Sequence, residues 1–156
     1  MKKLHFLLMV IALFYLMAPD LHAFQSEPKD FRGIQWGTNI SKLKHNMILF
    51  NTADNVKVYT KKNDSMKIRN ADIEKIHYFF SDGKFSDIVI TFKGMDNFII
   101  LKQVLFDTYG DGNKEDWPWE NYFWNGEQVK IKISIIKDSG TLMYIYKPLQ
   151  KKNDGL

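Results

Sequence analysis

The sequence predicts an α+β fold: a single domain in which an antiparallel sheet built from hairpins packs one main helix, about residues 96–109, on one face. Three observations support this prediction. Apolar and polar residues alternate on both sides of short turn sequences, as in antiparallel strands with one buried face. One segment between the hairpins has apolar residues at helical spacing. The chain of 156 residues is 45% hydrophobic and 15% aromatic, which is enough for one globular core.

Residues 1–23 are typical of an export signal peptide. A basic start, Met1–Lys3, precedes the apolar stretch Leu4–Ala18, and a polar segment beginning at Pro19 ends at the small residue Ala23. The apolar stretch is shorter than the roughly 20 residues that span a bilayer. We therefore expect cleavage after Ala23, no membrane span in the mature protein and a periplasmic or secreted location. An uncleaved N-terminal anchor is the alternative.

The remainder of the chain reads as one domain. Residues 24–30 have the composition of a flexible leader, residues 31–148 contain the predicted α+β domain, and residues 149–156 are expected to fray. The first part of the domain includes two short predicted strands, Met47–Phe50 and Val56–Tyr59. No internal repeat or linker divides the sequence.

A hairpin is predicted over residues 73–92. A two-residue turn at Asp82–Gly83 would mix apolar and polar side chains on both faces, whereas a three-residue turn at Ser81–Gly83 separates them. The three-residue turn places Asp87 opposite His77 on the outer face. It also gathers six apolar residues on the inner face: Ile76, Tyr78, Phe80, Ile88, Ile90 and Phe92.

The predicted helix begins after Asp96, a candidate N-cap residue, and ends at Gly110. Its apolar stripe consists of Phe98, Leu101, Leu105 and Tyr109.

Another hairpin is centred on Asn125–Gly126, the strongest short hairpin signal in the sequence. A two-residue turn there places Tyr122 and Trp124 on one face. The apolar residues of the following strand share that face: Val129, Ile131, Ile133 and Ile135. A last strand is predicted at Thr141–Tyr146.

Charge and cysteine content exclude several function classes. The net charge is only +4 and the lysines are scattered, with Lys61–Lys62 and Lys151–Lys152 as isolated pairs. Nucleic-acid binding requires a clustered basic surface, so we expect no nucleic-acid partner. The chain has no cysteine, which excludes disulfides, a thiol nucleophile, cysteine metal ligands and a lipid-modified N-terminal cysteine.

Five spaced segments carry a family resemblance, which covers nearly all of the chain after the signal. They are FRGIQWGT at 31–38, DSMKI at 64–68, the helix starting with NF and ending in YG at 97–110, YFW at 122–124 and YKP at 146–148. Together they resemble a family of small exported bacterial proteins of unknown function. The resemblance implies export and a shared fold. It brings no activity, and so no catalytic residue.

The segment 107–120, DTYGDGNKEDWPWE, is the most unusual stretch of the chain. It places acids and glycines at positions that partly match a calcium-binding loop. The bidentate glutamate expected at position 12 is replaced by Pro118, however, and Tyr109 occupies another ligand position. We therefore predict a helix end at Gly110 followed by a polar turn, with no metal and no cofactor.

The tryptophans are the strongest candidates for a contact surface. Trp117 and Trp119 lie on this short polar loop, and Trp36 lies in another loop punctuated by glycines. Exposed aromatic rings beside Asp116 and Glu120 would suit a saccharide or a peptide. The alternative is that Trp119 fills an open end of the sheet, because large aromatic side chains are usually buried.

The sequence favours a non-enzymatic role. No nucleophile elbow is present, and only His45 and His77 remain after the signal. The prediction is an exported binding or accessory protein of the bacterial envelope that contacts an envelope protein, a saccharide or a peptide through the 111–120 loop and Trp36. The alternative is a small hydrolase of envelope polymers that uses the loop carboxylates.

Overall fold

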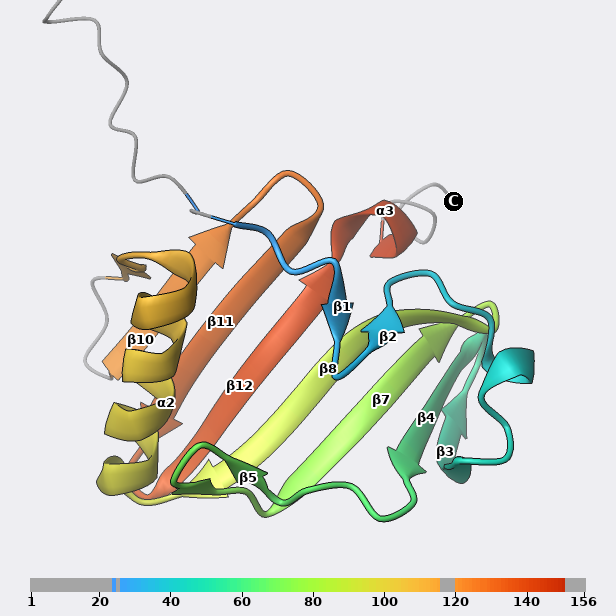
Figure 1. Ribbon diagram of the computed structural model, residues 1–156, viewed down its shortest axis with the longest axis horizontal. Coiled ribbons are helices and arrows are strands. Elements are labelled where there is room, and N and C mark those ends of the chain that lie inside the picture. The colour runs from blue at the N-terminus through green and yellow to red at the C-terminus, as the bar shows by residue number, and fades with distance from the viewer. Residues whose placement is uncertain (1–23, 25, 116–119, 151–156) are drawn as a thin grey trace, which may run out of the picture.

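A computed structural model describes residue 24, residues 26–115 and residues 120–150 of the chain. The predicted signal peptide therefore lies outside the described residues. An antiparallel sheet of eight strands dominates the structure, and one long helix crosses one of its faces (Figure 1). In the described part of the chain, no helix is long and apolar enough to cross a membrane.

The sheet is built from hairpins between sequence neighbours, with one crossover that brings β12 beside β8. In spatial order its strands are β3 (Met47–Ala53), β4 (Val56–Lys61), β7 (Lys75–Ser81), β8 (Lys84–Lys93), β12 (Ser139–Tyr146), β11 (Val129–Ile136), β10 (Glu120–Asn125) and β9 (Asn113–Lys114). Two small hairpins stand outside this sheet: β1 (Asp30–Phe31) with β2 (Ile34–Gln35), and β5 (Lys67–Ile68) with β6 (Ala71–Asp72). The helical elements are η1 (Ile40–Lys42), α2 (Met95–Tyr109) and α3 (Lys147–Gln150).

The prediction of an α+β fold is wrong, because the protein is predominantly β. Strands account for 52% of the structure and helices for 18%. The sequence pattern predicted the hairpins and the helix separately. Their union into one wide sheet depends on contacts between β8 and β12, whose residues pair across a long sequence separation. Helix α2 covers only part of one face of that sheet, so the sheet rather than the helix defines the architecture.

The β7–β8 hairpin has the predicted inner face but a different turn. Phe80 pairs with Phe85, so the turn has two residues, and Asp82 and Gly83 both have positive φ, 48° and 73°. Such a turn matches the twist of the strands. A bulge then leaves Ser86 as the extra residue and restores the separation of polar and apolar side chains.

A second consequence of this bulge is that Asp87 lies opposite Phe79, while His77 lies opposite Val89. The predicted pairing of His77 with Asp87 is therefore wrong. The His77 ring instead stacks on Phe50 at 4.6 Å. Burial and the nearby Lys75 lower the pKa of this imidazole.

The β10–β11 hairpin also keeps its predicted face with a shifted register. Trp124 pairs with Ile131 and Asn125 with Lys130, so the connection is longer than a two-residue turn. The shift is an even number of residues, and side chains in a strand alternate between faces. Trp124 therefore remains on the buried face, 2% exposed, although every pairing differs from the prediction.

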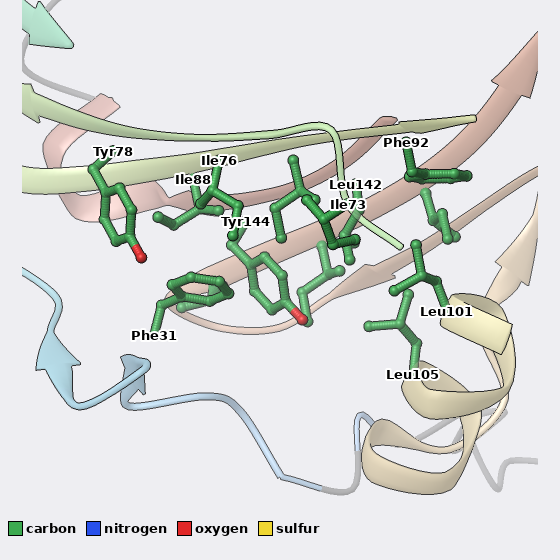
Figure 2. Packing of buried hydrophobic residues seen from close by; sticks show 14 of the residues in the cluster. Phe31, Ile73, Ile76, Tyr78, Ile88, Phe92, Leu101, Leu105, Leu142 and Tyr144 are labelled. Atoms are coloured by element: carbon green, nitrogen blue, oxygen red, sulfur yellow. The ribbon is translucent and has the colours of Figure 1, made fainter. Parts of the chain in front are cut away.

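Helix α2 closes the core on this face. It begins at Met95 after Gly94, so Asp96 lies in the first turn instead of capping it, and it ends at Gly110 as predicted. Its buried residues are Phe98, Leu101 and Leu105. In Figure 2 the side chains of the sheet point toward Leu101 and Leu105 of this helix and toward Phe31 of the β1–β2 hairpin. Helix and hairpin thus cover the same face of the sheet.

Candidate functional site

The β1–β2 hairpin brings Trp36 to the sheet. Arg32 and Gly33 form its turn with positive φ values of 51° and 79°. The ring of Phe31 packs against Tyr78 and Tyr144, with centroids 5.9 Å and 5.5 Å away. These buried rings anchor the hairpin, so the chain that follows is held against the ends of β8 and β12.

An ion pair fixes the same hairpin from its outer side. The Arg32 guanidinium donates to Asp64 Oδ1 at 2.6 Å and to the carbonyl oxygen of Ser65 at 2.8 Å. The Tyr78 hydroxyl donates to Asp64 Oδ2 at 2.7 Å. Burial and the hydrogen bond to Asp64 raise the pKa of Tyr78, which keeps this phenol a neutral donor. The network is saturated by its own members, and we assign it a structural role.

Trp36 lies at the edge of the core with its ring packed against two others. The ring is parallel to Phe85 at 4.8 Å and to Tyr146 at 6.2 Å. Its indole N–H donates to the carbonyl oxygen of Pro28 at 2.7 Å. The side chain is only partly buried. Trp36 is thus held in one orientation and still reaches the surface.

The segment before β1, predicted as a flexible leader, forms the opposite wall. Glu27 accepts hydrogen bonds from the backbone N–H groups of Gln128 at 2.8 Å and Val129 at 3.3 Å. Gly126 leaves the space that this carboxylate occupies, since a Cβ atom there would lie 1.7 Å from Glu27 Oε1. The β10–β11 connection therefore wraps around Glu27, which explains why it is longer than the two-residue turn predicted from Asn125–Gly126.

These walls enclose a half-open pocket of about 490 Å³. Trp36 and Tyr146 supply its aromatic surface. Its polar lining consists of Ser26, Glu27, Lys29, Gln35 and Gln128, with Pro28 between them. The volume lies in the range of small-molecule sites, about 300–1,000 Å³, and the combination of aromatic rings with a few amide groups is typical of such sites.

The pocket contains a single carboxylate, that of Glu27, which accepts hydrogen bonds from backbone N–H groups. No histidine is among the described residues that line the space. The described part of the chain also contains no group of three or more His, Asp or Glu side chains that could hold a metal ion. The amide, hydroxyl and charged groups of the lining can form hydrogen bonds with a ligand.

Of the five predicted contact residues, the structure describes Trp36 and Glu120. Glu120 begins β10 and pairs with Ile135, which in turn pairs with Gly140 of β12. Trp36 packs on Tyr146 at the other end of β12. The stretch of extended strand between Gly140 and Tyr146 is roughly 20 Å long, so the structure does not bring Trp36 and Glu120 together.

Glu120 is engaged by a lysine. Lys114 Nζ lies 3.1 Å from Glu120 Oε1, and this hydrogen bond lowers the pKa of the carboxyl. A general acid for glycoside cleavage needs the opposite shift. The other loop residues named above, Asp116, Trp117 and Trp119, lie outside the described residues.

Sequence reasoning missed Tyr146, Glu27 and Gln128. Tyr146 was predicted only as the last residue of a strand, and the two polar residues had no local pattern. One signal was present: Trp36 and Tyr146 belong to two separate segments of the family resemblance, 31–38 and 146–148, and the structure places them in contact. Residues in unrelated segments of such a pattern are candidates for a shared site.

Another hollow, of about 250 Å³, lies on the opposite face of the sheet. Asp87 is its charged residue, among the apolar side chains of Phe79, Val89, Met143 and Ile145. Gln150 of α3 donates to Asp87 Oδ1 at 2.8 Å. Burial raises the pKa of the Asp87 carboxyl. The carboxylate of this hollow already has a hydrogen-bond partner within the protein.

Comparison with protein-family models, curated proteins and solved structures finds no match to this chain. The resemblance to small exported proteins therefore stays a prediction, and functional proposals depend on the geometry of the chain itself.

Proposed function

We propose that this chain is an exported, non-enzymatic binding protein of the bacterial envelope whose ligand occupies the pocket beside Trp36. The observation that carries the proposal is the pocket itself: an indole held rigidly against Phe85 and Tyr146 next to polar groups that line an open space. A rigid aromatic wall loses little conformational entropy when a ligand packs against it. Export and envelope location follow from the signal-like N-terminus and remain predictions.

A saccharide or a short peptide fits this chemistry best. Both present apolar C–H surfaces that pack on aromatic rings and polar groups that hydrogen-bond with amides. Gln35 and Gln128 are exposed and offer such amides on two sides of the pocket. Lys29 and Glu27 give the pocket one charge of each sign, which suits a ligand without net charge.

The loop 111–120 is a separate candidate. Its residue Glu120 lies toward the other end of the strands from Trp36, so a ligand in the pocket and a partner at Glu120 would not compete for one surface. The proposal of a hydrolase gains no support from Glu120, whose lowered pKa disfavours proton donation.

The test uses the chain without its first 23 residues and two probe panels, envelope-type oligosaccharides and short peptides. Binding is measured by quenching of tryptophan fluorescence and then by calorimetry. Gln35→Ala and Gln128→Ala each remove one pocket amide, and a lost hydrogen bond of about 1 kcal/mol corresponds to roughly fivefold weaker binding. Gln103→Ala, at an exposed glutamine on α2, is the matched control and should leave affinity unchanged.

Two results would contradict the proposal. One is a ligand whose affinity is the same for all three glutamine variants, which would place its site elsewhere. The other is failure of every member of both panels to bind the folded protein.

A further inference from the structure

Strand β3 forms an edge of the main sheet that is built to accept another strand. We infer that an extended, acidic segment of a partner protein docks here by adding to the sheet beside β3. This inference is independent of the pocket beside Trp36, since it concerns the far end of the sheet and a protein partner.

Within the residues that the structure describes, the backbone of β3 is paired on one side only. In the spatial order of the sheet β3 comes first, and β4 is its neighbour. The strand has seven residues, Met47–Ala53, without a charged residue or a proline. Edge strands of soluble proteins are usually protected by charges, prolines or bulges. The bulge at Phe50 is the protection that β3 has, and the rest of the edge is long and uncharged.

Three consecutive large apolar residues are exposed on this edge. Ile48, Leu49 and Phe50 are 51%, 54% and 62% exposed. Leu49 pairs with Tyr59, which pairs with the core residue Tyr78, so Leu49 lies on the face that carries α2. Phe50 stacks on His77, which lies on the opposite face. The edge is therefore apolar on both faces of the sheet.

An added strand covers both faces at once, because its side chains alternate between them. It also offers hydrogen-bond partners to the N–H and C=O groups on the side of β3 away from β4, although the N–H of Thr52 already donates to Asn51 Oδ1 at 2.8 Å. A lipid surface would cover the apolar side chains but would leave those backbone groups without partners in an apolar medium, at a cost of several kcal/mol for each group. The backbone edge thus favours a strand over a membrane.

Charge around the edge selects the chemistry of that strand. The residues that precede and follow β3 in the range 42–62 include a single acid, Asp54. They include five lysines: Lys42, Lys44, Lys57, Lys61 and Lys62. Four of these lysines are exposed and Lys61 is partly buried. A second copy of this chain would bring the same positive charge to the contact, whereas an acidic segment complements it.

The experiment uses two synthetic peptides of equal length, one alternating valine with glutamate and one alternating valine with lysine. Hydrogen exchange of the β3 amides is followed by NMR while each peptide is titrated. We expect the glutamate peptide to slow exchange of the outward-facing β3 amides at least tenfold. We also expect its affinity to be at least tenfold higher than that of the lysine peptide and to fall as salt is added.

Substitutions on β3 test whether the peptide binds at this strand. Leu49→Asn and Phe50→Asn change side chains that are already more than half exposed, so the fold should survive, as a thermal melt would verify. Each removes apolar contact without changing the charge and should weaken the glutamate peptide about tenfold. Ile99→Asn, at a 51% exposed residue of α2, makes the same kind of change elsewhere and should have no effect.

Four outcomes would overturn the inference. The β3 amides stay unprotected at saturating peptide, or the two peptides bind equally. The amides are already protected without peptide and light scattering shows a dimer, which would make a second copy the occupant. The fourth is that anionic lipid vesicles bind the protein and Leu49→Asn abolishes this binding, while the glutamate peptide does not bind.

Discussion

Replacing Asp64 with asparagine tests the ion pair that holds the β1–β2 hairpin. The Asp64 side chain is 4% exposed and accepts hydrogen bonds from both the Arg32 guanidinium and the Tyr78 hydroxyl. Removing its charge leaves the guanidinium, 22% exposed, without a counterion. The fully buried Tyr78 hydroxyl must then hydrogen-bond to an amide instead of a carboxylate.

The cost can be worked out from these contacts. Removing one partner of a buried pair costs about 3–5 kcal/mol. Arg32 keeps the carbonyl oxygens of Ser65 and Lys67 as acceptors and has partial access to water. We therefore expect about 2–3 kcal/mol for Asp64→Asn, below the full range. Tyr78→Phe deletes one hydrogen bond and should cost about 1–2 kcal/mol.

The double variant should cost less than the sum of the two single changes, because both remove the hydrogen bond between Tyr78 and Asp64. The measurement is urea unfolding followed by circular dichroism, with the free energy of unfolding extrapolated to water. Asp72→Asn breaks a similar pair with Lys67, but there the side chains are 72% and 62% exposed. This control should cost less than about 0.5 kcal/mol. Equal losses for Asp64→Asn and Asp72→Asn would refute the assignment of the Asp64 network as a buried anchor.

Two further predictions concern the sheet itself. Burial raises the pKa of Asp87, so its charged form destabilises the fold at pH values above that raised pKa. Asp87→Asn still accepts a hydrogen bond from Gln150 and should stabilise the protein at pH 7. This gain in stability should disappear below the ordinary pKa of 3.8, as urea unfolding at pH 7 and pH 3 would show. A gain that is the same at both pH values would contradict the prediction. Gly140→Ala places a Cβ atom 2.0 Å from the ring of Phe92, a buried residue that cannot move into solvent. Such overpacking should cost about 1–3 kcal/mol and lower the melting temperature, and an unchanged melting temperature would show that the ring has room to shift.

Two predicted contact residues, Trp36 and Glu120, lie far apart in the structure. Trp36 was grouped with Glu120 because both flank glycine-rich or polar loops. The sheet puts these two residues toward opposite ends of β12, and that distance is set by the register of β10, β11 and β12. Register across three strands depends on packing of whole faces, which no local stretch of sequence specifies.

The sequence by itself determined which side chains face the core. Ile76 and Trp124 are buried as predicted, although both hairpins have other registers than expected. The physical reason is that side chains alternate with a period of two, so any even shift or compensating bulge preserves the buried set. The end of α2 at Gly110 was also predicted from local sequence, because a positive φ at the end of a helix favours glycine.

The tertiary structure decided what the local pattern could not. Glu27 holds the backbone of Gln128, 101 residues away, and this contact opens the turn at Gly126. The pairing of β8 with β12 joins separate hairpins into one predominantly β sheet, and β3 is an edge strand of this sheet in the described part of the chain. Such contacts join segments that are far apart in the sequence and share no local pattern. They stabilise the fold only once the whole sheet has formed.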